Sequence, residues 1–320
     1  MVSVFVYRNG ETHTSGRVDP KWIDPASGAT VWVDIAAPTE ADGQLLADVF
    51  HVHPLAIEDA LSKTQAPKIE PYPGYLYVVL HGIDFTLAQH QFATRDVDFF
   101  VGPNYLVTVH DGESRSIAKL REVCQKHAHL LTEGPVGLMH RIIDQMVDHY
   151  QPMMEQVEKQ IDHLEEQAYH GQENLVRRVL RLKRDVAQMR RVLIPQRDAV
   201  GRLARREFPA ITDEMSYRFR DVYDHVVRLT EEAMLFQDRV TGILEVNLST
   251  VSYRLNQVMK VLTVVSTIFM PLTLLTGMWG MNVKLPWLPG GEAAQFWWVT
   301  GVMLALTAAM LGYFRARDWI

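Results

Sequence analysis

Two long uncharged segments near the C-terminal end limit what this chain can fold into. Residues 261–283 contain no charged side chain over 23 positions, and residues 293–314 contain none over 22. A helix needs about 20 apolar residues to cross the hydrocarbon core of a bilayer, so each segment is long enough to span it. Buried helices of soluble proteins rarely run that far without a charge. We therefore predict two membrane-spanning helices joined by a short loop.

The charges around these segments predict their orientation. Positive residues precede the first segment and follow the second, at Arg254, Lys260, Arg315 and Arg317. The loop of residues 284–292 carries only Lys284 and Glu292. Because positive side chains stay on the cytoplasmic side, we expect both termini inside and the loop outside. The N-terminal residues lack a basic patch followed by an apolar core, so we expect no secretory signal.

The first part of the chain has the pattern of an α/β domain. Segments rich in Val, Tyr and Phe and bounded by turn residues predict strands at residues 2–7, 30–35, 75–81, 96–101 and 105–110. Between them, Thr39 can cap a helix running to residue 50, and Pro54 fits the first turn of a short helix. Another helix is expected over residues 114–131. We predict a cytoplasmic α/β domain over residues 1–133.

Residues 134–257 are predicted to form long helices. The helix-forming pattern breaks only near Gly171 and Phe208-Pro209. Seven acidic residues lie between positions 144 and 166, and eleven Lys and Arg lie between 177 and 206. This change of sign favours an antiparallel helical hairpin whose arms attract each other. A basic run can also bind nucleic acid, but the acidic neighbour and the net charge of −6 argue against that partner.

A row of polar and small side chains follows the last long helix, which is predicted to run unbroken from residue 212 into the first span. At alternating spacings of four and three residues the row is Asp238, Gly242, Glu245, Ser249, Ser252, Asn256, Met259, Thr263, Ser266, Met270, Thr273 and Gly277. Such a row normally carries Leu, Ile and Val, because it faces partner helices. Close packing of membrane helices explains small and hydroxyl residues, but it explains Asp238, Glu245 and Asn256 poorly. We interpret the row as the lining of a water-filled pore that attracts cations. Two spans cannot enclose a pore, so an oligomer is required.

The first span ends in an aromatic-Gly-Met-Asn sequence, Trp279-Gly280-Met281-Asn282. At the outer end of a penultimate span, this sequence resembles the signature of the CorA family of magnesium and cobalt channels. Further segments are similar to those of the family, namely residues 256–263, residues 267–273 with Gly277, His53-Pro54-Leu55 with Glu58-Asp59, residues 219–225 and Trp319-Ile320. The resemblance covers the chain from end to end in the same order.

The resemblance implies a funnel-shaped homopentamer in which the first span of each subunit lines the pore. Gly280, Met281 and Asn282 would form the selectivity filter at the outer mouth. Mg²⁺ gives up its waters reluctantly, so a ring of Asn282 amide oxygens could recognise the hydrated ion. Taken together, the polar row and the resemblance give as predicted pore-lining residues Glu245, Asn256, Met259, Leu262, Thr263, Ser266, Met270, Thr273 and Gly277. Among them, Met259, Leu262 and Met270 would narrow the pore and gate it by dewetting.

The resemblance also implies regulatory Mg²⁺ sites between cytoplasmic subunits. The matching residues are Asp59 and Asp221, with Glu58 and Asp144 as partners in a second site. Carboxylates that face each other repel, and a divalent ion relieves this repulsion. Loss of the ion when cytoplasmic Mg²⁺ falls would loosen the assembly and open the pore. Mg²⁺ is therefore expected as both the transported and the regulatory ion.

The outer loop departs from the pattern of magnesium-transporting members. It has no acidic residue before Glu292, and its Pro289-Gly290-Gly291 element is more similar to the zinc-transporting ZntB branch. Passage of Co²⁺, Zn²⁺ or Ni²⁺ therefore stays open, and a proton-coupled zinc transporter is the alternative reading.

Other metal chemistry and catalysis have weaker support in the sequence. Cys124, His127 and His129, and separately His51 and His53, are possible zinc ligands, but without a second matched pair we expect surface or packing roles. No phosphate-binding loop, His-Glu-x-x-His or Gly-x-Ser-x-Gly motif occurs. We therefore expect no enzyme, and a membrane-anchored enzyme or signalling domain is the third reading.

These expectations divide the chain into consecutive parts. They are the α/β domain (1–133), a long-helix stalk (134–257), the first spanning helix with the Gly-Met-Asn motif (258–283), the outer loop (284–292), the second spanning helix (293–314) and a basic cytoplasmic tail (315–320). The expected location is the inner membrane of the cell. The expected partners are further copies of the chain, the lipid bilayer and divalent cations.

Overall fold

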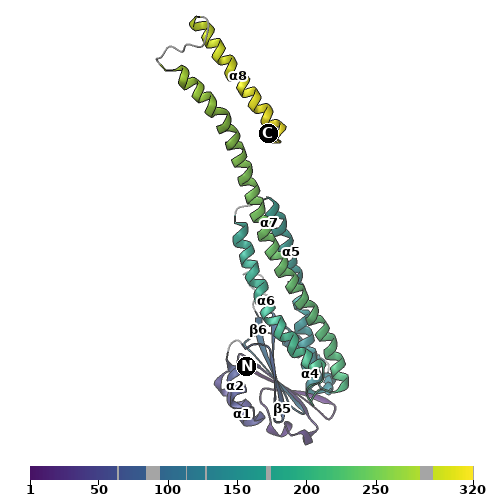
Figure 1. Cartoon of the computed structure of the whole chain (residues 1–320). Coiled ribbons are helices and arrows are strands. Elements are labelled where there is room, and N and C mark those ends of the chain that lie inside the picture. Colours follow the sequence, from purple (N-terminus) through teal and green to yellow (C-terminus); the bar gives the residue numbers. More distant parts are fainter. Residues whose placement is uncertain are drawn as a thin grey trace. The chain divides into compact units, whose positions relative to one another are not determined.

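The computed structural model describes most of the chain, and Figure 1 shows its ribbon. The described residues are 1–62, 65–83, 94–112, 114–126, 128–170, 174–281 and 291–319. The chain divides into two compact units. The first comprises Met1–Gln167 and Gln172–Leu244, and the second comprises Ala168–Gly171 and Glu245–Ile320. Helix α7 (Asp213–Trp279) contributes to both.

The first unit is built on a seven-stranded mixed sheet. Its strands are β1 (Val2–Arg8), β2 (Glu11–Ser15), β3 (Thr30–Ala36), β4 (Lys68–Tyr72), β5 (Tyr75–Ile83), β6 (Thr94–Val101) and β7 (Tyr105–His110). They lie in the order β2-β1-β3-β7-β6-β5-β4. Strands β3 and β7 pair in parallel, and the other five neighbouring pairs are antiparallel. All five predicted strands are confirmed. The pattern missed β2 and β4, the two edge strands, whose mostly exposed or half-buried residues weaken the apolar alternation.

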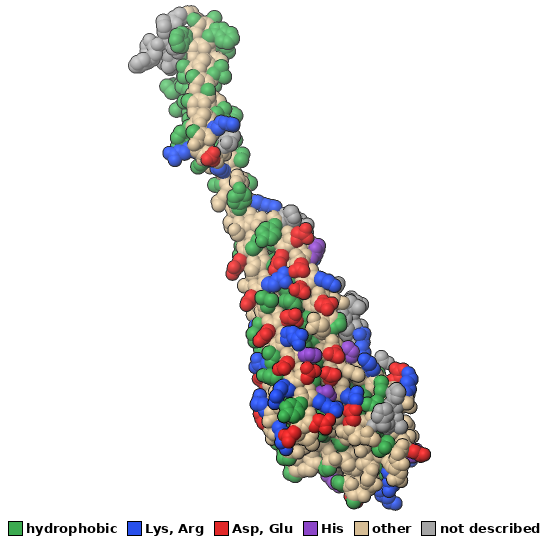
Figure 2. Space-filling model, turned by 90° about the vertical axis from the view of Figure 1, so that its right-hand side faces the viewer, with side chains coloured by type: hydrophobic (Ala, Val, Ile, Leu, Met, Phe, Trp, Pro, Cys, Tyr) green, Lys and Arg blue, Asp and Glu red, His purple; other side chains and the backbone are tan. Residues whose placement is uncertain are grey.

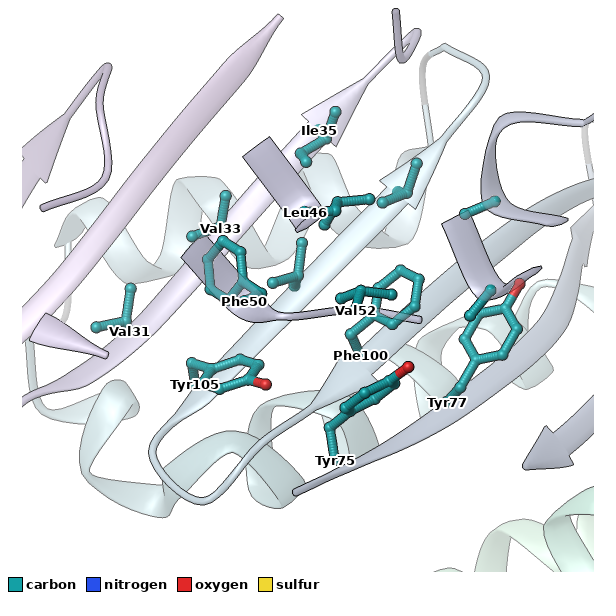
Figure 3. Packing of buried hydrophobic residues seen from close by; sticks show 14 of the residues in the cluster. Val31, Val33, Ile35, Leu46, Phe50, Val52, Tyr75, Tyr77, Phe100 and Tyr105 are labelled. Carbon is teal, nitrogen blue, oxygen red and sulfur yellow. The ribbon is translucent and has the colours of Figure 1, made fainter. Parts of the chain in front are cut away.

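Two short helices cover one face of the sheet. Helix α1 (Glu40–Phe50) begins after Thr39, which forms a capping box with Asp42. Helix α2 (Pro54–Leu61) begins with a proline, whose missing N–H has no partner to lose in the first turn. Both predicted helix starts are confirmed. Figure 3 shows the apolar cluster between these helices and the sheet, which includes Val31, Val33, Ile35, Leu46, Phe50, Val52, Tyr75, Tyr77, Phe100 and Tyr105.

Helices α3 (Arg115–Lys126) and α4 (Gly134–Asp148) follow the last strand, and α4 contacts β3, β5, β6 and β7. The prediction of one helix over residues 114–131 is wrong in its last part. Helix α3 ends at Lys126, and the chain continues as a short 3-10 helix, η3 (Ala128–Glu133). Leu130 and Leu131 of this helix are both buried.

The rest of the first unit is helical. Helix α5 (Tyr150–His170) and helix α6 (Leu175–Ala204) precede α7, and the predicted breaks near residues 171 and 208 are confirmed. The predicted charge attraction between the two hairpin arms is corrected. In the described part of the bundle, acids of α5 pair with Arg239 of α7, which contacts Asp162 and Glu165 at 2.5 and 2.7 Å. The reason is that the buried Val and Leu of α6 face the bundle, whereas Arg177, Arg181 and Arg184 are exposed.

The second unit contains the two long apolar stretches. Helix α7 continues through Pro271 to Trp279, and α8 covers Glu292–Ala316. Their most apolar windows are only 11% and 0% buried within the chain, whereas a core helix of a soluble domain is mostly buried. Figure 2 shows hydrophobic side chains over this unit and mixed charges over the first. Length, composition and exposure therefore agree with the two predicted membrane spans.

Candidate functional site

The polar row of α7 is exposed along the apolar part of the helix. The predicted pore-lining side chains are all solvent-accessible in the single chain, namely Asn256, Met259, Leu262, Thr263, Ser266, Met270, Thr273 and Gly277. Glu245, three helical turns before Asn256, is exposed as well. The helix is unbroken between them, so its regular winding brings these positions onto one side. A polar side of an apolar helix requires water or a partner rather than lipid.

Another side of α7 is covered instead. Val264 is 7% exposed, whereas Met270 is 78% exposed. Lys260, one turn before Val264, donates a hydrogen bond to the carbonyl of Asp318 just after α8, and its ammonium lies 5.9 Å from the Trp319 ring. The end of α8 is thus tied to the side of α7 that carries Lys260 and Val264. The polar row points elsewhere and stays uncovered.

Two hydroxyl groups of the row are already committed to the helix backbone. Thr263 Oγ1 donates to the carbonyl of Met259 at 2.7 Å, and Thr273 Oγ1 donates to that of Phe269 at 2.8 Å. Each hydroxyl hydrogen is therefore used inside the helix, and the free lone pairs of the oxygen accept hydrogen bonds from outside. The waters around a metal cation are oriented as donors. Both threonines consequently present the group that a hydrated cation prefers.

The structure describes only part of the predicted filter. Gly280 follows the last residue of α7, and its N–H donates to the Thr276 carbonyl at 2.8 Å. A Cβ at position 280 would lie 3.3 Å from that carbonyl oxygen, tighter than ordinary van der Waals contact, so the close turn favours glycine. Met281 is exposed. Asn282 and residues 284–290 of the outer loop lie outside the described residues.

The four predicted regulatory carboxylates fall into two pairs within one chain. Glu58 and Asp59 lie on α2, while Asp144 and Asp221 lie on α4 and α7. Partial burial raises the pKa of Asp144, and the nearby carboxylates of Asp148 and Asp221 raise it further. Asp144 and Asp221 are therefore neighbours. Across the part of the chain that the structure describes, no hydrogen bond or ion pair joins this pair to Glu58 or Asp59.

The donor chemistry of these pairs fits Mg²⁺, which prefers carboxylate oxygens. Glu58 and Asp221 are exposed, and the mutual repulsion at Asp144 is the kind that a divalent ion relieves. Among the described residues of a single chain, however, no group of three or more His, Cys, Asp or Glu side chains could hold a metal ion. A site formed from both pairs would need a second copy of the chain.

Asp59 has a cationic partner that sequence reasoning missed. The Lys68 ammonium lies 2.6 Å from its Oδ2 atom. Lys68 belongs to β4, an edge strand that the sequence pattern did not predict because its apolar alternation is weak. No sequence signal therefore connected Lys68 with Asp59. Their contact depends on how α2 packs against the sheet.

The possible zinc ligands do not form a site in the described residues. Burial raises the pKa of Cys124 to about 11, so its thiol stays protonated at neutral pH and is a poor ligand. His53 accepts a hydrogen bond from the Leu55 N–H and caps α2. His127 and the side chain of His129 lie outside the described residues.

The family model of the CorA-like Mg²⁺ transporter protein matches residues 27–316 of the chain. YfjQ of Bacillus subtilis is 35% identical over 296 residues, covering 91% of this chain and 90% of YfjQ. The cobalt/magnesium transport protein CorA of Thermotoga maritima is 32% identical over 301 residues, covering 92% of this chain and 84% of that protein.

The fold agrees with a solved structure. The CorA magnesium transporter from Methanocaldococcus jannaschii matches with a TM-score of 0.86 at 20% identity, covering 100% of this chain and 99% of that one. The expected architecture, a mixed-sheet domain followed by long helices and two C-terminal apolar helices, is thereby confirmed. The chain belongs to the family of CorA-like Mg²⁺ transporter proteins, as the motif around Gly280 predicted, and is a membrane transporter of divalent metal ions rather than an enzyme.

Proposed function

We propose that the chain forms a homopentameric, gated channel for divalent cations in the inner membrane, with Mg²⁺ as the first substrate and Co²⁺ as the second. The observation that carries this proposal is the exposed polar row of α7, which no other described element covers. Copies arranged around an axis would turn these rows toward one water-filled path. The name of the Thermotoga maritima relative supports the choice of ions.

The chemistry of the row suits an ion that keeps its water shell. Asn256 offers an amide oxygen, and Thr263 and Thr273 offer hydroxyl oxygens whose hydrogens are used in the helix. Such acceptors bind the waters of Mg²⁺ without removing them. Gly280, Met281 and Asn282 form the outer filter in this proposal. Met259, Leu262 and Met270 form apolar constrictions that close by dewetting.

In this arrangement the two spans divide the chain by compartment. Residues 1–133 and 134–257 lie in the cytoplasm, residues 258–283 and 293–314 cross the membrane, residues 284–292 form the outer loop, and residues 315–320 return to the cytoplasm. Arg254, Lys260, Arg315 and Arg317 then lie on the inner side, as the positive-inside rule requires.

We further propose that cytoplasmic Mg²⁺ closes the channel by bridging subunits. Glu58 and Asp59 of one copy would meet Asp144 and Asp221 of the next, since each pair alone is too small to hold the ion. The bound ion would offset the repulsion between these carboxylates and stabilise the closed assembly. When Mg²⁺ falls, the repulsion returns and the assembly loosens.

Protease protection of the purified full chain tests the regulatory proposal. Mg²⁺ should slow cleavage of the wild type, and Asp221→Ala should lose most of that protection. Asp213→Ala is the matched control, because Asp213 lies on the same helix, is exposed and pairs with Arg206 instead. If Asp221→Ala keeps full protection by Mg²⁺, the sensor assignment is wrong.

Ion flux in proteoliposomes tests the transport proposal. Purified protein should admit Mg²⁺ and Co²⁺ down their gradients, with no need for a pH gradient. The alternative, a proton-coupled zinc transporter, rests on the Pro289-Gly290-Gly291 element of the loop and predicts Zn²⁺ uptake that follows the pH gradient. Absence of flux with all three metals would overturn both readings. Native mass spectrometry of the same preparation checks the pentamer.

A further inference from the structure

The carboxylate of Asp59 is shared with an ammonium group inside the same chain. Lys68 Nζ lies 2.6 Å from Asp59 Oδ2 and 3.0 Å from Glu70 Oε1. The Lys68 side chain is 26% exposed and that of Asp59 is 29% exposed, so the pair is half-buried and partly shielded from solvent. At these distances both contacts are charge-assisted hydrogen bonds.

Strand geometry holds Lys68 in place independently of Asp59. Lys68 and Glu70 are two residues apart on β4 and therefore point to the same face. They stand opposite Val79 and Tyr77 of β5. The Lys68 ammonium lies 5.3 Å from the centre of the Tyr77 ring, and Glu70 is in turn held by the Tyr72 hydroxyl at 3.2 Å. The lysine thus has an anchor on its own strand and reaches across to α2.

We infer that Lys68 is a tethered competitor of the regulatory cation for Asp59. This inference rests on the proposed role of Asp59 as a ligand of Mg²⁺. An ion that binds Asp59 Oδ2 takes the position of the ammonium, because two cations cannot share that oxygen at contact distance. Glu70 then keeps the released ammonium nearby. Binding of Mg²⁺ requires the contact between Lys68 and Asp59 to break. The free energy of that contact therefore weakens the binding of Mg²⁺ to the carboxylates.

The arrangement has a functional consequence for the sensor. A cluster of carboxylates without an internal cation would bind Mg²⁺ more tightly, because no ammonium would have to be displaced. Lys68 neutralises Asp59 in the ion-free state and raises the Mg²⁺ concentration needed for closure. Glu70 has the opposite effect to Lys68. It draws the ammonium away from Asp59 and so lowers the Mg²⁺ concentration needed for closure.

The test uses the full-length protein in detergent, stripped of metal with EDTA, and measures the thermal midpoint against Mg²⁺ concentration. Lys68→Met should lower the half-effect concentration about three- to tenfold, since it removes one charge beside the ion. Glu70→Gln should raise it, because Lys68 is then left to Asp59 alone. These opposite shifts give two independent readings, so the inference stays testable if one variant fails to fold.

Three further variants separate the possible outcomes. Lys159→Met, which removes an exposed lysine of α5, should leave the half-effect concentration unchanged. Lys68→Arg keeps the charge and should stay closer to the wild type than Lys68→Met. Asp59→Asn should abolish the response to Mg²⁺. If Asp59→Asn responds like the wild type, the regulatory site and this inference both fall. If Asp59→Asn loses the response but Lys68→Met shows no decrease, the inference alone is overturned.

Discussion

The phenol of Tyr77 on β5 donates a 2.6 Å hydrogen bond to the buried Oδ1 atom of Asp98 on β6. Burial raises the pKa of the Asp98 carboxyl to about 7, although the hydrogen bond from Tyr77 works against this rise. The carboxyl is therefore partly neutral at physiological pH. The free energy of unfolding of the first unit therefore depends on whether the Asp98 carboxyl is protonated.

This relationship predicts a pH dependence with a definite sign. The folded pKa lies above the ordinary value of 3.8, so the folded state holds the proton more tightly than the unfolded state. The resulting stabilisation is complete below pH 4 and is lost as the pH rises through about 7. Asp98→Asn keeps a hydrogen-bond acceptor without a charge to bury. At pH 8 it should be more stable than the wild type by roughly 2–4 kcal/mol.

Unfolding of the full chain in detergent with EDTA, followed from pH 5 to pH 8, measures the effect. The difference between Asp98→Asn and the wild type should widen as the pH rises. Asp48→Asn, at an exposed position of α1, should track the wild type throughout. A constant difference across this range would show that Asp98 is ionised in the folded protein.

A second prediction concerns Asp34, which is 1% exposed on β3 and accepts hydrogen bonds from three residues of β7 and α3. Its oxygens lie 2.7 Å from Thr108 Oγ1, 3.1 Å from His110 Nε2 and 2.5 Å from Arg121 Nη2. Arg121→Met removes the cation and leaves a buried carboxylate without full compensation. We expect a loss of about 3 kcal/mol in the free energy of unfolding.

Lys126→Met is the matched control on the same helix. Lys126 pairs with Glu122 in an exposed i,i+4 contact at 2.5 Å, and solvent screens such pairs. Lys126→Met should therefore change the free energy of unfolding little. Equal losses for the two variants would show that Asp34 does not depend on Arg121.

A third prediction concerns Arg239, which ties α7 to α5. Its guanidinium lies 2.5 Å from Asp162 and 2.7 Å from Glu165, and hydrogen bonds to these carboxylates raise its pKa. Arg239→Met should lower the thermal midpoint by a few degrees, or on the order of 1 kcal/mol. The difference should shrink at high salt, because screening already weakens the wild-type contacts. Arg191→Met, on the exposed side of α6, should have no comparable effect.

A fourth prediction concerns the pore. Thr273→Val keeps the shape of the side chain and removes the oxygen that accepts hydrogen bonds from a hydrated ion. If Thr273 lines the path, Mg²⁺ flux in proteoliposomes should fall about tenfold, since each copy loses one hydrogen bond. Thr273→Ser should restore most of it.

Thr300→Val provides the control for Thr273→Val. Thr300 donates to the Phe296 carbonyl at 2.9 Å, so it has the same backbone hydrogen bond, but on α8. Its variant should transport like the wild type. A similar loss in both variants would indicate a defect in the helices themselves and would remove Thr273 from the pore.

Several elements were predictable because their signal is local. Thr39 and Pro54 mark the starts of α1 and α2, and continuous helix-forming residues predict α7 from residue 212 onward. The edge strands β2 and β4 were not predictable, because most of their residues are exposed or half-buried and so carry little apolar alternation. The partner of the acidic arm was also mistaken. Opposite charges on consecutive helices suggested α6, whereas packing turns Arg239 of α7 toward α5.

The sequence by itself determined the two membrane spans, the polar row from Asp238 to Gly277 and the family. These features are patterns of charge, spacing and short motifs along neighbouring residues, and they exist before the chain folds. Only the tertiary structure decided that Lys68 pairs with Asp59, that Tyr77 binds Asp98 and that Asp144 lies near Asp221. Each of these contacts joins separate helices and strands, so strand register and helix packing determine them, and no local pattern records those distances.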